Sequence, residues 1–178
     1  GDPRVYAQRG RVVHSGERWY LESLDGRCRI PIVFRALPAA RRARLALTIP
    51  GTKTIELAAL GKPAVAVTPF NAPELVAVNG PLTYLDRVPL VGVPLKRSVA
   101  MAVAKRFPFH TQPNIDAGEM VLCELHGTVT PGRVARVTLE RYDDASWLRT
   151  TSERLERLYL DHAGAADRMA ASLLALAG

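Results

Sequence analysis

Two short apolar runs flank a stretch with helical periodicity between residues 45 and 68, and this pattern constrains the fold more than any other. Leu45–Ile49 ends at Pro50-Gly51 and is typical of a strand buried on both faces. Thr52–Leu60 places apolar residues on one helical face and is followed by Gly61 and Pro63, which end helices. Ala64–Thr68 is a second buried strand. A strand, a helix and a strand in close succession form a βαβ unit, so we expect an α/β fold with a parallel sheet.

The rest of the chain adds strands, helices and a loop-rich segment, Pro69–Pro94. Thr130-Pro131 has the residues of a helix start, Thr as N-cap and Pro at the first helical position. Residues 1–44 form a β-rich leader that ends in a basic helix or linker, Arg35–Arg44, and residues 45–178 form a Rossmann-like domain with a helical tail. We expect strands at Arg4–Ala7, Trp19–Leu24, Arg29–Phe34 and Met120–Leu125, and helices at Lys96–Phe107, Gly132–Tyr142, Ala145–Asp161 and Ala165–Leu176.

Composition excludes several classes of protein. With 48% hydrophobic and 23% charged residues, the chain can bury a core, which excludes disorder as the main state. No apolar run approaches the ~20 residues that cross a bilayer. Two cysteines far apart, Cys28 and Cys123, are typical of a reduced cytoplasmic protein, although one disulfide is formally possible. No pair of histidines has the spacing of a metal site, so no metal is expected.

The positive charge is concentrated in one part of the sequence. The formal net charge is +7, and residues 1–50 hold ten arginines against four acidic residues. Residues 107–178 hold seven basic and ten acidic residues. A basic lobe favours an anionic partner such as phosphate, nucleic acid or an anionic membrane. Arginine outnumbers lysine 20 to 4, so the composition of a GC-rich genome explains the same excess.

The turn from the first buried strand into the following helix is a candidate nucleotide site. The first N–H groups and the positive dipole of a helix attract anions, and Gly51 lets a phosphate approach the backbone. Thr52 and Thr54 offer hydroxyl donors, Lys53 offers a charge, and Glu56 lies one turn further on, within reach of sugar hydroxyls. Ligands of parallel sheets bind at the carboxyl ends of strands. A plain turn with an exposed glutamate explains the same residues, and no Gly-rich nucleotide signature is present.

A second candidate stretch is Gln112–Pro131, which could place Asn114 and Glu124 in a cleft. From spacing alone, the simpler interpretation is that Asn114 is a turn residue and Glu124 a solvated one.

Together these stretches resemble the carboxyl-terminal half of lipid-A-disaccharide synthase and related glycosyltransferases. The resemblance covers about residues 45–178. It rests on Pro50-Gly51-Thr52-x-Thr54-x-Glu56-x-Ala58-x-x-Gly61-x-Pro63, on Pro113-Asn114-Ile115-x-Ala117-Gly118 with Glu124-Leu125 and Thr130-Pro131, and on Arg154-Leu155, Gly164-Ala165-Ala166 and Arg168-Met169-Ala170.

This resemblance implies the GT-B fold, in which two Rossmann-like domains face each other across a cleft. The family transfers a UDP-linked acylated glucosamine to a lipid monosaccharide phosphate without a metal or other cofactor. By resemblance, Gly51 and Thr52 face the diphosphate and Glu56 the ribose of the UDP-sugar. Asn114, Gly118 and Glu124 line the same cleft, and Thr54 belongs to the same motif.

The family's Leu-Pro-Gly-Ser-Arg stretch and its amino-terminal, acceptor-binding domain have no counterpart in this sequence. The resemblance places the catalytic base in that domain, so we expect a donor-side half that binds a UDP-sugar but does not turn over by itself. The implied acceptor is a lipid-linked sugar at the cytoplasmic face of a membrane. Exchange of carboxyl-terminal helices in the family also implies a domain-swapped homodimer.

Two other interpretations stay open. A non-catalytic module could bind nucleic acid or an anionic membrane through Arg35–Arg44 and Lys96–Arg106. Nucleic acid is the less favoured partner because few aromatic residues are interleaved with these basic ones. Sugar-nucleotide epimerases share the GT-B architecture, and spacing alone does not exclude them.

Overall fold

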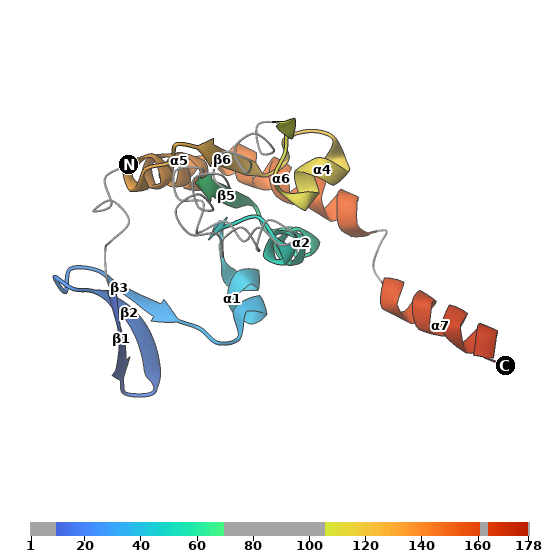
Figure 1. Ribbon diagram of the computed structural model, residues 1–178, viewed down its shortest axis with the longest axis horizontal. Helices are drawn as coiled ribbons and strands as arrows, with labels where there is room; N and C mark the ends of the chain where they lie inside the picture. The colour runs from blue at the N-terminus through green and yellow to red at the C-terminus, as the bar shows by residue number, and fades with distance from the viewer. Residues whose placement is uncertain (1–9, 70–105, 161–163, 178) are drawn as a thin grey trace, which may run out of the picture.

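The first described part of the chain is a three-stranded antiparallel sheet. The computed structural model describes residues 10–69, 106–160 and 164–177. Strands β1 (Gly10–Ser15), β2 (Arg18–Ser23) and β3 (Arg29–Ile32) pair in sequence order, and α1 (Ala36–Arg42) follows them. Figure 1 shows this sheet standing apart from the remaining strands and helices. The β-rich character predicted before residue 45 is present.

A second, parallel sheet organises the following residues. Its strands β4 (Ala46–Thr48), β5 (Ala64–Pro69) and β6 (Cys123–Gly127) lie in that order, with β5 in the centre. Helix α2 (Thr52–Ala59) connects β4 to β5. The βαβ unit and the parallel sheet predicted from the sequence are confirmed, and the fold is α/β, compatible with a Rossmann-like arrangement.

Helices surround this sheet. The structure contains α4 (Gln112–Ala117), α5 (Pro131–Asp143), α6 (Ala145–Leu160) and α7 (Ala165–Ala177). Helix α2 packs against α4 and α6, whereas α5 packs against β5 and α6. In Figure 1, α7 extends away from the other helices, at the carboxyl-terminal end. The three helices predicted after residue 130 are confirmed to within one residue at each end.

The core is formed by two clusters of buried side chains. The first cluster contains Ala58 of α2 and Leu155 of α6. These side chains pack with Ala64 of β5 and with Leu122, the residue before β6. The other centres on Val65, with partly buried Val134 and Trp147 packed against it. The sheet is therefore covered by helices on two sides, as an apolar parallel strand such as β5 requires.

Two predictions about strands need correction. Leu45–Ile49 is not buried on both faces, because Leu47 is 55% exposed and β4 lies at the edge of the sheet that the described residues form. No strand was expected at β1, since Val12 and Val13 are the only adjacent apolar residues there. Pairing with β2 over all six residues stabilises it instead. The strand expected at Arg4–Ala7 lies outside the described residues.

Several other expectations fall wholly or largely outside the described residues. These are the loop-rich Pro69–Pro94 and most of the helix expected at Lys96–Phe107. Cys28 is exposed and Cys123 is buried, and both are free thiols. Within the described ranges, no helix combines the length and apolar character needed to cross a bilayer.

Candidate functional site

The start of α2 lies at the carboxyl edge of the parallel sheet and presents an open stretch of backbone. Gly51 has φ 147° and ψ −167°, a conformation essentially restricted to glycine. Among the residues that the structure describes, no atom of another segment lies within 4 Å of the position a Cβ would occupy there. Gly51, Thr52 and Lys53 are all exposed. The first N–H groups of a helix have no acceptor within the helix, so a ligand can approach them here.

Thr54 has a structural role in this turn. It is fully buried, and its Oγ1 donates a 2.6 Å hydrogen bond to the carbonyl oxygen of Gly51. Its backbone N–H donates to the same oxygen over 2.9 Å. Both donors therefore stabilise the turn. Because the Thr54 hydroxyl already donates to Gly51, Thr52 is the residue left for the expected hydroxyl contact with a ligand.

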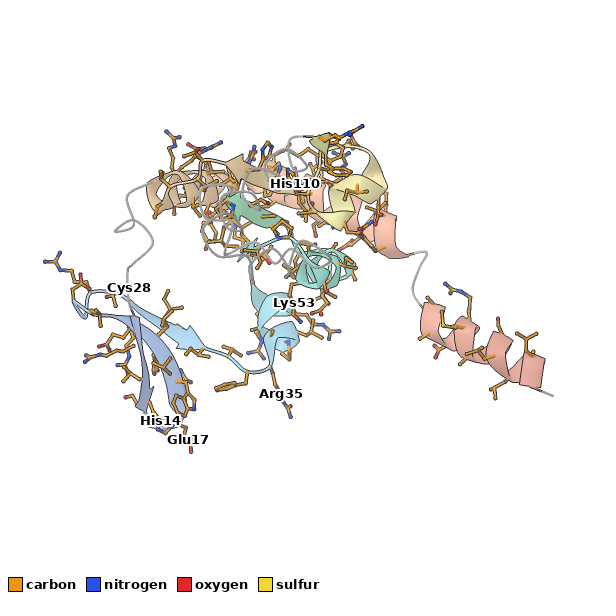
Figure 2. The ribbon with its side chains drawn as sticks, viewed as in Figure 1. His14, Glu17, Cys28, Arg35, Lys53 and His110 are labelled. Atoms are coloured by element: carbon orange, nitrogen blue, oxygen red, sulfur yellow. The ribbon has the colours of Figure 1, made fainter. Side chains whose placement is uncertain are left out.

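Glu56 and Lys53 form an ion pair on the exposed side of α2. Lys53 Nζ lies 2.8 Å from each carboxylate oxygen of Glu56. The two residues are three positions apart, which brings their side chains together on a helix. Figure 2 labels Lys53 at α2. A ligand bearing both phosphate and hydroxyl groups could engage the two partners separately.

Asn114 and Glu124 are brought together, but inside the protein. Asn114 is fully buried and Glu124 is 8% exposed. Glu124 Oε1 accepts hydrogen bonds from Asn114 Nδ2 at 2.7 Å, Thr111 Oγ1 at 2.6 Å and Thr111 N at 2.9 Å. Its Oε2 accepts from the N–H of His110 at 2.9 Å. The interpretation of Glu124 as a solvated residue is wrong.

The Asn114 side chain also binds the two residues that lead into β6. Its Oδ1 accepts from the N–H groups of Val121 and Leu122, at 2.9 and 2.7 Å, and its Nδ2 also donates to the Leu122 carbonyl. Asn114 lies in α4 and not in a turn. This helix ends at Gly118, which has φ 66°. The contacts of Asn114 and Glu124 fasten α4 to β6. Both side chains are buried in these contacts, whereas Gly118 is exposed.

Three residues that the sequence analysis did not single out lie near the same edge. Thr68 on β5 pairs in register with His126 on β6, and the rings of His126 and His110 are 5.2 Å apart. Thr68 Oγ1 is buried and makes no hydrogen bond in the part of the chain that the structure describes. A polar residue one position before the end of each of two buried strands, Thr68 and His126, is the sequence signal for this cluster.

Burial lowers the pKa of the His110 imidazole, because a charged ring loses hydration there. The negative charge of Glu124 opposes this shift, and the positive charge of His126 adds to it. Neutral His110 is therefore favoured. Over the described ranges, no three His, Cys, Asp or Glu side chains cluster closely enough to hold a metal ion.

The fold and this edge define an α/β protein with a small parallel sheet and an open helix start. No protein-family model, curated protein or solved structure matches the chain.

Proposed function

We propose that this chain is the donor-binding half of a UDP-sugar-dependent glycosyltransferase of the GT-B class, related to lipid-A-disaccharide synthase. The conformation of Gly51 is the observation that carries the proposal. A glycine-only backbone with open space beside it, at the start of α2, is where a diphosphate can approach a helix. Glycine adopts this conformation without strain, whereas a residue with a Cβ does not, and such glycines occur where a ligand approaches the backbone closely.

Each exposed residue at the start of α2 has a distinct role in this proposal. The N–H groups near Gly51 and Thr52 bind the diphosphate, with the Thr52 hydroxyl as a further donor. Lys53 supplies a positive charge to the same phosphates. Glu56, released from Lys53, accepts hydrogen bonds from the ribose hydroxyls. Breaking the exposed Lys53–Glu56 ion pair to make these contacts costs little free energy, because an exposed ion pair contributes about 1 kcal/mol or less to stability.

The buried contacts of Asn114 and Glu124 support binding indirectly. They fix α4 to the residues just before β6 and to the first part of that strand, and so hold the strand in the sheet. Transfer of the sugar to a lipid-linked acceptor needs the second domain of the GT-B class. This chain alone is proposed to bind the donor and not to transfer the sugar.

Calorimetry with UDP and with 2′-deoxy-UDP tests the proposal. We expect UDP to bind and Gly51→Val to abolish binding, because its side chain would fill the phosphate position. Glu56→Gln should weaken UDP binding more than binding of 2′-deoxy-UDP, which lacks one of the hydroxyls. Glu153→Gln, an exposed change on α6, is the matched control.

Two results would count against the proposal. The first is no heat with millimolar UDP when circular dichroism shows folded protein. The second is binding that weakens steeply with salt and does not distinguish UDP from other polyanions, which would favour a basic interaction module.

A further inference from the structure

The polar side chains near the ends of β5 and β6 lie on the face of the parallel sheet that α2 covers. Ala64 of β5 packs with Ala58 of α2, and Thr68 lies four positions further along the strand, so both residues are on that face. His126 is the register partner of Thr68 on β6 and shares its face. Val65, by contrast, packs on the side of α5.

The start of α2 and this pair of residues lie at the same edge of the sheet. Strand β4 ends at Thr48, and α2 begins at Thr52 just beyond it. Neighbouring strands are about 4.8 Å apart, so the end of β4 lies about 10 Å from β6 in the order β4-β5-β6. A diphosphate and the sugar joined to it can span that distance. A donor whose diphosphate binds at the start of α2 can therefore place its sugar at the ends of β5 and β6.

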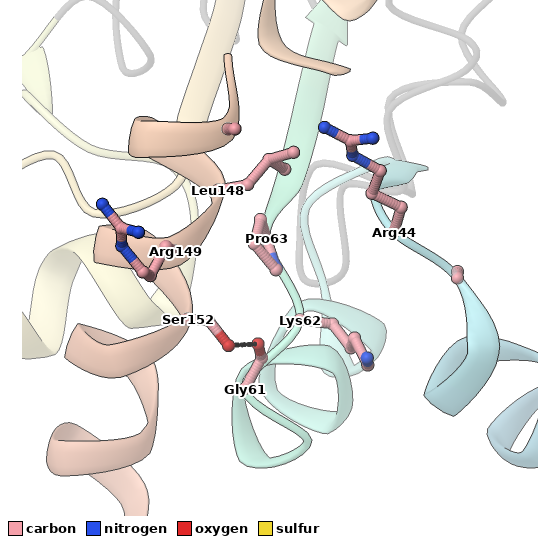
Figure 3. A pocket seen from close by; sticks show the side chains of 9 residues that line it. Arg44, Gly61, Lys62, Pro63, Leu148, Arg149 and Ser152 are labelled. Carbon is pink, nitrogen blue, oxygen red and sulfur yellow. Dashed lines mark hydrogen bonds between the residues drawn. The ribbon is translucent and has the colours of Figure 1, made fainter. Parts of the chain in front are cut away.

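Helix α2 is also held at its other end. Gly61 follows the helix, and its carbonyl oxygen accepts a 2.6 Å hydrogen bond from Ser152 Oγ of α6 (Figure 3). Ala58 of α2 and Leu155 of α6 pack together in the core. The start of α2 therefore has a fixed position relative to the ends of β5 and β6.

The Thr68 hydroxyl makes no hydrogen bond in the part of the chain that the structure describes. Thr68 is 5% exposed, and its Oγ1 is buried. A buried hydroxyl without a partner costs free energy, and most such groups in folded proteins have one. On the same face of the sheet, both carboxylate oxygens of Glu124 accept hydrogen bonds. The Thr68 hydroxyl therefore marks a position at which a ligand oxygen would be stabilised.

His126 places an exposed imidazole beside this hydroxyl. Its ring lies 5.2 Å from that of His110, at an interplanar angle of 64°. The backbone N–H of His110 is bonded to the buried Glu124 carboxylate, which fixes the segment that carries the second ring. A neutral imidazole donates from one nitrogen and accepts at the other. Sugar hydroxyl groups, which also donate and accept, match this pattern.

We propose that Thr68 and His126 bind the sugar of the UDP-sugar donor. The inference rests on the proposed function, because UDP at the start of α2 sets the place of the sugar. The Thr68 hydroxyl donates to one sugar oxygen, and the His126 imidazole bonds to a neighbouring hydroxyl. The ligand of the whole site is then a hydroxyl-bearing sugar linked to the diphosphate, and free UDP fills only part of it.

Calorimetry with UDP, UDP-glucose and UDP-N-acetylglucosamine tests this sugar site in the whole chain. We expect at least one of the two sugar nucleotides to bind about tenfold more tightly than UDP, since the sugar adds two hydrogen bonds. Thr68→Val and His126→Ala should each weaken binding of that sugar nucleotide by about fivefold and leave the affinity for UDP unchanged. Thr68→Val should also raise the melting temperature, because it removes a buried hydroxyl without a partner.

Thr138→Val is the matched control. Thr138 also has a buried hydroxyl without a hydrogen bond among the described residues, but it lies on α5, which packs on the other face of the sheet. This variant should raise the melting temperature in the same way and leave both affinities unchanged.

The outcomes separate the sugar site from the UDP site. A gain in affinity from the sugar that both Thr68→Val and His126→Ala reduce, with UDP binding kept, supports the sugar site. UDP binding without a gain from either sugar, a gain that either variant retains in full, or an equal loss in Thr138→Val overturns it and leaves the proposed function intact. Absence of UDP binding in folded protein overturns the proposed function and this inference with it.

Discussion

The amide of Asn114 on α4 donates a 2.7 Å hydrogen bond to the carboxylate of Glu124 on β6, and both side chains are buried. The amide oxygen of Asn114 accepts from the backbone N–H groups of the two residues just before β6, Val121 and Leu122. The Asn114 side chain thereby joins a short helix to a strand and to the residues before it. The hydrogen bonds of Asn114 therefore stabilise the fold, and they would affect ligand binding only through the position of α4 and β6.

Replacing Asn114 with alanine should destabilise the protein strongly. The N–H groups of Val121 and Leu122 would stay buried without their acceptor, and Glu124 would lose one donor. We expect the free energy of unfolding to fall by about 3 kcal/mol or more, since each orphaned buried group costs about 1–3 kcal/mol. Urea denaturation monitored by circular dichroism measures the change.

Gln112→Ala is the matched control for this substitution. Gln112 lies on the same helix, but its bond to Asp116 is exposed, so the cost should be within about 0.5 kcal/mol. A similar small cost for Asn114→Ala would contradict a structural role and favour direct contact with a ligand.

The sequence predicts the α/β framework because its signals are local. The turn at Gly61 and Pro63 and the N-cap at Thr130 act within a few residues, and the structure contains both. Helix α4 was missed because its six residues carry no apolar periodicity. Its position depends on Asn114 and Glu124, which lie ten positions apart and become partners only after folding.

The same contrast between local signals and contacts formed only after folding applies to the candidate sites. Gly51 could be chosen from the sequence, since a glycine between a buried strand and a helix already indicates a special backbone conformation. The pairing of Lys53 with Glu56 follows from helical spacing. The approach of the His110 and His126 rings could not be foreseen, because the two residues lie in separate segments.

Gly51→Ala should lower both stability and UDP binding. Alanine rarely adopts φ 147°, so we expect a loss of about 1–3 kcal/mol in the free energy of unfolding. The proposed diphosphate contact at this backbone should weaken at the same time, by tenfold or more in affinity. Thermal denaturation with and without UDP measures both effects.

Gly132→Ala separates backbone strain from the general effect of replacing a glycine. Gly132 lies in α5, and a Cβ there would meet no atom within 4 Å. Alanine should therefore raise the free energy of unfolding by about 0.5 kcal/mol. A gain of the same size for Gly51→Ala would refute strain at Gly51.

The two leucines Leu155 and Leu174 should respond very differently to truncation. Leu155 of α6 is fully buried in the cluster with Ala58 and Leu122, whereas Leu174 of α7 is 74% exposed. Leu155→Ala should cost about 2–5 kcal/mol, because it leaves a cavity in the core. Leu174→Ala should change stability by about 0.5 kcal/mol or less. Equal effects in urea denaturation would show that α7 is packed against other residues in solution.

His110 should titrate below its ordinary value of about 6.5. Because burial lowers this pKa in the folded state, the unfolded chain takes up the proton first as the pH falls. The contribution of neutral His110 to the free energy of unfolding is therefore fully present above pH 6.5. It is lost as the pH falls from 6.5 through the lowered pKa of the folded state. NMR titration of the ring protons gives the pKa directly, and denaturation at several pH values gives the slope.

Removing the neighbouring charge should reverse part of this shift. His126→Gln eliminates the repulsion from His126, so the pKa of His110 should rise toward 6.5. His14→Gln changes a histidine on β1, in the other sheet, and should leave the His110 titration unchanged. His110→Gln should also flatten the dependence of stability on pH just below 6.5, because the titrating ring is removed. The backbone N–H of residue 110 that binds Glu124 is retained in this variant. A His110 pKa at or above 6.5 in the unaltered protein would contradict burial as the dominant effect.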